Sequence, residues 1–152
     1  MNSPTDKDRV IDTVIRLFIN TDNRDWKKVK ALFTESVFFD MQSVSGARAS
    51  ILTPREIVDG WEKGLKPLKA IHHQAGNFQV EIEDNEATVF CYGIAWHYLP
   101  NPSGRNTRTF VGSYDMRLLN QFGEWKIDRF KYNLKFIDGN ADLEQRAAEK
   151  AA

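Results

Sequence analysis

The sequence predicts an α+β fold in which N-terminal helices pack on a curved antiparallel sheet and leave a half-open cone. Two observations predict it. Capped, amphipathic helical patterns fill much of the first 67 residues, and long segments rich in aromatic and β-branched residues fill most of the remainder. A cone of this kind encloses a cavity. The chain length of 152 residues suits one core, so we expect a single domain over residues 1–152.

The first helix is expected over residues 3–22, "SPTDKDRVIDTVIRLFINTD", with Ser3 as its N-cap. Apolar residues recur at helical spacing within it, and one stripe consists of Ile11, Ile15 and Phe18. Asp22 continues this stripe, so a carboxylate is expected on the buried face near the helix C-terminus, where the dipole disfavours negative charge. Asp22 either caps the following helix or has a partner that compensates its burial.

Two further helices and one strand are expected before the main sheet. The segment "NRDWKKVKALF" predicts a short helix over residues 23–33, and "SVFFDM" predicts a strand over residues 36–41. Another helix is expected in "TPREIVDGWEKGLKP", residues 53–67. Thr53 and Glu56 have the spacing of a capping box at its start.

Four long strands should follow, and the turn-forming stretches between them indicate an antiparallel meander. They span residues 70–83, 86–99, 107–120 and 124–137. The second strand alternates clearly. Its cavity-facing side is expected to carry mostly small residues, namely Ala87, Val89, Cys91, Gly93, Ala95 and His97. Its other side carries Phe90, Tyr92, Ile94, Trp96 and Tyr98. We expect this large apolar side to form subunit contacts in a homo-oligomer.

The third strand places Ser113 and Asp115 on one face. Both could reach the cavity beside His97. Alternatively, Asp115 pairs with a nearby arginine at the protein surface, which is the commoner situation for such residues.

Two adjacent histidines, His72 and His73, must point to opposite faces of the first long strand, so at most one faces the cavity. Regular alternation counted back from Phe78 puts His72 on the apolar face. Gly76 weakens that count, because a glycine inside a strand often marks a β-bulge, which exchanges the faces upstream of it. Periodicity alone therefore does not decide whether His72 or His73 faces the cavity.

Composition excludes several classes of function. Lys+Arg and Asp+Glu balance at 21 each, which argues against binding to nucleic acid or to a membrane surface. No segment approaches the roughly 20 apolar residues needed to span a bilayer. The one cysteine, Cys91, and a charged N-terminal segment without an apolar signal core predict a cytoplasmic protein. The chain has no Gly-rich phosphate loop and no spaced His/Cys cluster, so no metal or other cofactor is expected.

The order of elements resembles a known family over nearly the whole chain. A helix ending in Asp, then "TDNRDWKKVKALFTESVFFD", a capped helix and strands with "GEWKI" near the end resemble the SnoaL-like branch of the nuclear-transport-factor-two-like superfamily. The resemblance implies a cystatin-like half-open cone and a homotrimer, with a homodimer as the alternative. Within that branch the chain looks most like the scytalone dehydratases, the lindane dehydrochlorinases and the bile-acid dehydratases.

Three positions carry this closer resemblance. Asp22 falls where those enzymes keep an aspartate that orients a histidine, and His73, followed by Gly76, falls where they keep the catalytic histidine base. The resemblance therefore chooses His73 over His72 and implies a bulge near Gly76. His97 falls where scytalone dehydratases keep a second active-site histidine.

The resemblance also implies a substrate-binding set, with departures. Ser113 and Asp115 fall where scytalone dehydratases have a serine and an asparagine. Thr21 and Met41 stand where those enzymes have tyrosines that polarise the substrate carbonyl, and Phe130 stands where the dehydrochlorinases have an arginine. The substrate-binding residues expected around Asp22, His73 and His97 are Ser113, Asp115, Met41, Phe38, Trp61 and Phe130.

The residue types fit proton abstraction. An aspartate bonded to one imidazole nitrogen fixes the tautomer and raises the basicity of the other nitrogen. We therefore expect a cofactor-independent lyase (a dehydratase) or isomerase that acts on a small cyclic or aromatic molecule, with His73 as base. A protonated His97 would assist a leaving hydroxyl or stabilise an enolate. Two alternatives remain: a non-catalytic domain that binds a small hydrophobic ligand, and the small subunit of a ring-hydroxylating dioxygenase.

Overall fold

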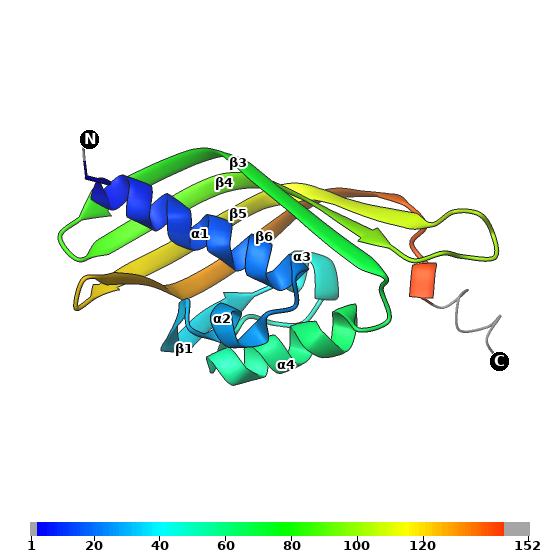
Figure 1. Cartoon of the computed structure of the whole chain (residues 1–152), viewed down its shortest axis with the longest axis horizontal. Coiled ribbons are helices and arrows are strands. Elements are labelled where there is room, and N and C mark those ends of the chain that lie inside the picture. The colour runs from blue at the N-terminus through cyan, green and yellow to red at the C-terminus, as the bar shows by residue number, and fades with distance from the viewer. Residues whose placement is uncertain (1–2, 145–152) are drawn as a thin grey trace.

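The computed structural model describes residues 3–144, in which helices pack on one side of a curved, six-stranded sheet (Figure 1). The helices are α1 (Asp6–Asp22), α2 (Trp26–Lys30), α3 (Gln42–Ser45) and α4 (Pro54–Leu65). The strands are β1 (Phe33–Asp40), β2 (Ser50–Leu52), β3 (Ala70–Glu83), β4 (Glu86–Tyr98), β5 (Thr107–Gln121) and β6 (Glu124–Gly139). Among the described helices, none has the length and apolar character needed to cross a membrane.

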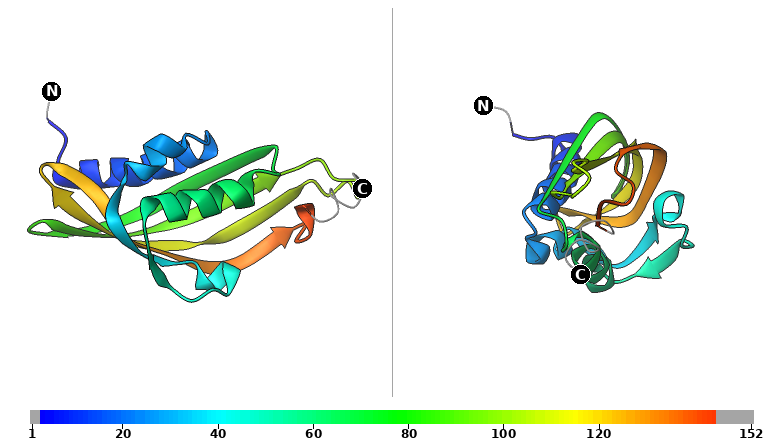
Figure 2. Two further views of the ribbon diagram at one scale, coloured as in Figure 1. Left: turned by 90° about the horizontal axis from the view of Figure 1, so that it is seen from below. Right: turned by 90° about the vertical axis from the view of Figure 1, so that its right-hand side faces the viewer.

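The sheet has the strand order β2-β1-β6-β5-β4-β3 and confirms the predicted α+β cone. Strands β3 to β6 form the expected antiparallel meander, but β1 runs parallel to β6, so the sheet is mixed. Periodicity within β1 shows which side chains share a face, but it specifies neither the partner strand nor its direction. The end-on view in Figure 2 shows the sheet curling round, with α1 and α4 closing the open side of the curve.

Helix α1 begins after the N-cap Thr5, so the expectation that Ser3 is the N-cap was wrong. The Thr5 hydroxyl accepts a hydrogen bond from the backbone N–H of Asp8 at 3.1 Å, and the Asp8 carboxylate accepts one from the backbone N–H of Thr5 at 2.9 Å. This reciprocal capping box satisfies two N–H groups at once. A single candidate cap at Ser3 cannot compete with it.

The buried face of α1 is rotated from the expected stripe. Its buried residues are Val10, Thr13, Val14, Leu17, Phe18 and Thr21. Ile15 is 38% exposed and Ile11 is only partly buried, because the line through Val10, Val14 and Leu17 faces the sheet. Phe18 and Asp22 lie at the edge of the contact, next to β3.

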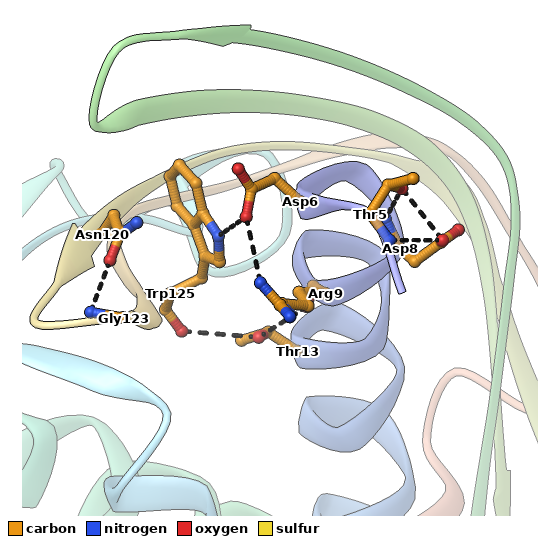
Figure 3. Close-up of polar contacts among 8 residues, drawn as sticks. All are labelled: Thr5, Asp6, Asp8, Arg9, Thr13, Asn120, Gly123 and Trp125. Atoms are coloured by element: carbon orange, nitrogen blue, oxygen red, sulfur yellow. Dashed lines mark hydrogen bonds and ion pairs between the residues drawn. The ribbon is translucent and has the colours of Figure 1, made fainter. Parts of the chain in front are cut away.

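The N-terminal half of α1 is fastened to the β5–β6 turn, as Figure 3 shows. The Thr13 hydroxyl donates to the Trp125 carbonyl oxygen at 3.4 Å, and the Trp125 indole N–H donates to the Asp6 carboxylate at 3.5 Å. Trp125 itself is buried. The "GEWKI" segment thus sets the position of α1 on the sheet.

The remaining helices follow their capping signals. The Asp25 carboxylate caps α2, which ends at Lys30. The predicted continuation of this helix to Phe33 was wrong, because Phe33 already pairs with Ile127 in the sheet. Thr53 and Glu56 form the predicted capping box of α4. The short elements α3 and β2, with four and three residues, were not predicted, because they are too short to show a period.

The small-residue face of β4 points inward, as predicted. Ala87, Val89, Cys91 and Ala95 are buried on it. Gly93 lies on the same face, where a Cβ atom would overlap the ring of Tyr114, so the glycine makes room for that ring. The opposite face points outward and leaves apolar side chains exposed.

Candidate active site

The concave side of the sheet and the helices enclose a cavity of about 250 Å³. Its walls come from α1, α4, the segment after β1, and strands β3 to β6. The lining is mostly apolar: Leu17, Phe18, Thr21, Met41, Val44, Gly60, Trp61, Gly64, Leu65, His73, Ala95, His97, Phe110, Tyr114, Phe130 and Tyr132. No aspartate, glutamate, lysine or arginine of the described residues is among them, so the polar groups of this cavity are two imidazoles and a few hydroxyls.

Asp22 and His73 form the central polar contact. The Asp22 Oδ1 atom lies 2.6 Å from His73 Nδ1, and Asp22 Oδ2 accepts a hydrogen bond from the His73 backbone N–H at 2.8 Å. Both side chains are 15% exposed. A carboxylate can only accept, so Nδ1 carries a proton, and in the neutral ring Nε2 then keeps its lone pair. The ring of Phe18 stacks on the imidazole at 5.4 Å and limits its rotation.

The end of α1 is held against the start of β3 by Arg24. This residue takes a left-handed backbone conformation (φ 56°) just after the helix. Its guanidinium donates to the Leu68 carbonyl at 2.7 Å and to the Leu65 carbonyl at 3.3 Å. These bonds bring the helix end that carries Asp22 next to the strand that carries His73.

A β-bulge decides which histidine faces the cavity. The pairing of β3 with β4 shifts between Gly76 and Gln79, and Asn77 has a φ of 54°. His73 pairs with Ala95 on the inner face. His72 pairs with Trp96 on the outer face, where the two rings lie 5.7 Å apart. The bulge expected near Gly76 is confirmed, and the structure turns His73 inward.

His97 lies on the inner face of β4, two residues after Ala95, and also lines the cavity. Its Nδ1 atom is 3.0 Å from an Arg108 guanidinium nitrogen, and Arg108 in turn contacts Glu144 at 2.5 Å. Burial lowers the pKa of His97 to about 4, and the positive charge of Arg108 acts in the same direction, against opposing contributions from Glu144 and Asp22. The expectation that a protonated His97 assists the reaction is therefore corrected: near neutral pH this imidazole carries no charge.

Two tyrosines that the sequence did not assign to the site line the cavity. Tyr114 pairs with Cys91 in the sheet and therefore shares its inner face. Burial raises the pKa of Tyr114, and it raises the pKa of Tyr132 to about 12, so both phenols stay protonated near neutral pH. The Tyr132 hydroxyl is buried and has no hydrogen-bond partner among the described residues. The β4–β5 register would have revealed Tyr114, and the β5–β6 register, which pairs Tyr114 with Tyr132, would then have revealed Tyr132. The long loop between β4 and β5 hides the first of these registers in the sequence.

Three expected site residues lie on the other face of the sheet. Ser113 and Asp115 point outward because Tyr114, between them, points inward; Asn133 donates to both side chains, at 3.2 and 2.8 Å. Phe38 also points outward, where the Arg129 guanidinium sits 4.4 Å from its ring centroid. Their assignment to the cavity was wrong.

The remaining expected lining residues are in place. Met41, Trp61 and Phe130 border the cavity. Phe39, next to the expected Phe38, packs behind them, and its ring stacks on Phe130 at 5.5 Å. Because side chains alternate along β1, a shift of one residue separates the inner phenylalanine from the outer one.

Residues 3–131 match the SnoaL-like domain. The chain belongs to this family. A comparison with curated protein sequences found no match. Within the described residues, no group of three His, Cys, Asp or Glu side chains is placed to hold a metal ion.

Solved structures share the fold at low sequence identity. Kfla4162 from Kribbella flavida is 21% identical with a TM-score of 0.86, and the match covers 92% of this chain and 97% of that one. A protein described as a possible scytalone dehydratase from Novosphingobium aromaticivorans is 16% identical (TM-score 0.72, 86% and 84% covered). The hexachlorocyclohexane dehydrochlorinase LinA-type3 from Novosphingobium barchaimii is 12% identical (TM-score 0.74, 89% and 90% covered).

Proposed function

We propose that this SnoaL-like protein is a cofactor-independent lyase or isomerase that removes a proton from carbon in a small, neutral, cyclic or aromatic substrate. The observation that carries the proposal is the contact of 2.6 Å between Asp22 and His73 Nδ1 at the wall of an apolar cavity. His73 is the general base and Asp22 orients it.

The geometry suits a base. Asp22 holds the Nδ1 proton, and this leaves Nε2 free to accept a proton from substrate. When Nε2 accepts it, the imidazolium is stabilised by the carboxylate behind it. A positioned base of this kind typically contributes about 10²–10⁴-fold to a rate.

The cavity fits the proposed substrate class. Its volume of about 250 Å³ exceeds the ~150 Å³ of an engineered apolar cavity that holds benzene, so a ring with substituents or a second ring can enter. Sites for small molecules are commonly apolar with a few placed polar groups. No charged side chain among the described lining residues favours an ionic substrate.

The electron pair left by the departing proton determines the product class. If the substrate carries a hydroxyl or halide on the next carbon, the pair forms a double bond and the group leaves with its bonding electrons, which is elimination. If the pair forms an enolate that is protonated at another carbon, the result is isomerisation. The dehydratase and dehydrochlorinase names of two structural neighbours both denote elimination.

Proton exchange tests the base before any substrate is known. Ketones such as cyclohexanone and 1-tetralone have exchangeable protons beside the carbonyl, and NMR in D₂O follows their replacement. We expect the wild-type protein to accelerate exchange for at least one ketone of a small panel, and His73→Gln to lose about 10²–10⁴-fold of that acceleration. His72→Gln is the matched control, since His72 faces outward against Trp96, and it should keep the wild-type rate. Ketones that bind without any accelerated exchange would contradict the base.

A second candidate is a binding domain without catalysis. The largely apolar lining favours it, because such a cavity can hold a small hydrophobic molecule whether or not His73 reacts. In that case His73→Gln would change ligand affinity or melting temperature but no rate.

The small subunit of a ring-hydroxylating dioxygenase remains a weaker candidate, which a stable complex with a large partner chain would support. We also propose a cytoplasmic location, which the buried, free Cys91 supports, because free cysteines are typical of reducing compartments.

A further inference from the structure

Behind His97 lies a partly buried ion pair, between Arg108 and Glu144, that the proposed base does not use. Arg108 stands directly opposite His97 in the β4–β5 pairing, and its side chain is only 14% exposed. Its guanidinium contacts His97 Nδ1 at 3.0 Å and the two Glu144 carboxylate oxygens at 2.8 and 2.5 Å. The ring of Phe110 lies 5.3 Å from the guanidinium and also 5.0 Å from the imidazole.

The guanidinium of Arg108 determines which ring nitrogen of His97 carries the proton. Arginine has donors only and stays charged, so the ring nitrogen that it contacts must offer a lone pair. The Nδ1 atom of His97 is therefore unprotonated, and the single proton of the neutral ring sits on Nε2. The charged or titratable groups that face His97 are Arg108 from β5, Glu144 from the C-terminal segment, His73 from β3 and Asp22 from α1.

From these contacts we infer that Arg108, held by Glu144, is a positioning residue that keeps His97 neutral with its proton on Nε2, so that His97 donates a hydrogen bond to an oxygen of the bound molecule. This rests on the proposed function, in which negative charge develops on a substrate oxygen when His73 removes a proton. His97 then stabilises that oxygen without giving up its own proton.

The C-terminal segment is built to hold Arg108 in place. Leu143 is fully buried against Leu68 and Ile71, and the Asn101 side-chain amide donates to the Leu143 carbonyl at 2.9 Å. Glu144 follows directly and pairs with Arg108. A guanidinium with this little exposure needs an opposite charge beside it, because an unpaired buried charge is strongly destabilising.

The two imidazoles then present complementary groups to one cavity. His73 offers a lone pair on Nε2, since its proton sits on Nδ1, which donates a hydrogen bond to Asp22. His97 offers an N–H on Nε2, since Arg108 occupies its Nδ1 lone pair. A cyclic ketone can place its α-proton against the first and its carbonyl oxygen against the second.

Nitrogen NMR tests the state of His97 with no substrate present. In protein labelled with ¹⁵N at histidine, we expect wild-type His97 to show a protonated Nε2 and an unprotonated Nδ1 throughout pH 5.5–8. Arg108→Gln should let His97 take up a proton within that range, and Arg108→Lys, which keeps a charged donor, should restore the wild-type pattern. Arg105→Gln is the matched control, because Arg105 is a nearby arginine that contacts the end of β6 (the Gly139 carbonyl, 2.8 Å) and no contact with His97 is found for it.

A wild-type His97 that is protonated near pH 6, or that carries its proton on Nδ1, overturns the inference even if Arg108→Gln fails to fold. The donor role is tested with 1-tetralone and with tetralin, which has the same rings and no oxygen. We expect 1-tetralone, but not tetralin, to shift the His97 Nε2–H signal. A His97 signal that 1-tetralone leaves unmoved, whether or not other cavity signals move, overturns the donor role. Lost α-proton exchange with an intact His97 pattern would remove only the role of His73.

Discussion

Asp22→Asn is the sharpest perturbation of the proposed site, because the structure predicts which tautomer it creates. Asp22 accepts two hydrogen bonds from one residue, from the His73 backbone N–H at 2.8 Å and from His73 Nδ1 at 2.6 Å. Asparagine has one acceptor oxygen and one NH₂ donor. The backbone N–H is always a donor, so the asparagine oxygen must take it, and the NH₂ group then faces Nδ1. His73 can satisfy that donor only by moving its proton to Nε2.

The expected loss follows from that change. A His73 with its proton on Nε2 has no lone pair in the cavity, so catalysis of α-proton exchange should fall by the full contribution of a positioned base, about 10²–10⁴-fold. The free energy of unfolding should fall by about 1.5–3 kcal/mol, the usual value of hydrogen bonds to a charged group. For a chain of this size that corresponds to about 2–4 °C of melting temperature per kcal/mol.

Three measurements check this. Histidine ¹⁵N spectra should show the proton of His73 on Nε2 in Asp22→Asn, ketone exchange should give the rate, and thermal unfolding should show that the protein is still folded. Asp25→Asn is the control, since Asp25 caps α2 only three residues away and asparagine is an equally good cap. A variant with the proton still on Nδ1, or with the wild-type exchange rate, would refute the assignment of Asp22 as the orienting residue.

Three other expectations concern stability and assembly. His97 has a pKa of about 4 in the folded protein and 6.5 in the unfolded chain, so the unfolded chain binds more protons between these two pH values, and the melting temperature should fall as the pH drops from 6.5 to 4. His97→Gln should make the melting temperature less dependent on pH in this range. An unchanged dependence would contradict the burial of a neutral His97. Gly93→Ala should cost about 1–3 kcal/mol, because its Cβ overlaps the buried ring of Tyr114, whereas Gly60→Ala, with no atom within 4 Å of the new Cβ, should not destabilise; equal melting temperatures would be evidence against the close packing at Gly93. We propose that the outer face of the sheet, where Tyr92 is 45% and Phe136 is 54% exposed, joins copies of the chain in a homotrimer or homodimer; sedimentation as a monomer at micromolar concentration would rule this out.

Most of the fold was predictable because its helices and strands are marked by local sequence patterns, namely turn residues and helix caps. The four long strands were placed to within two residues at each end, since their turns carry strong signals. The capping box at Thr53 and Glu56 marked α4. What failed was non-local: the parallel pairing of β1 with β6 depends on how the sheet closes. The cap at Thr5 was missed although its partner Asp8 has the right spacing, because Ser3 followed by Pro4 is also a typical helix start.

The site was predictable where one element fixes a face and not where two elements must be placed in register. Alternation within β4 correctly turned His97 inward. In β5 the same reasoning gave the wrong face to Ser113, since alternation says which residues share a face but not which face is inside. Only the pairing of Tyr114 with Cys91 settles it. The choice of His73 came from resemblance alone, because the sequence around Gly76 marks where a bulge can form and not that it does.

One cavity thus holds two histidines as opposite tautomers, and the difference comes from the charged residue behind each ring. Asp22 behind His73 is an acceptor with negative charge, so it draws the proton to Nδ1 and leaves a basic Nε2. Arg108 behind His97 is a donor with positive charge, so it takes the Nδ1 lone pair, disfavours the imidazolium and leaves an N–H on Nε2. Both charges are kept out of the cavity lining, so the groups presented to a ligand are neutral in an apolar enclosure. Passing a proton from one neutral ring to the other would be unfavourable, so both rings stay neutral. They act together only when a molecule with an acidic C–H and an oxygen lies between them.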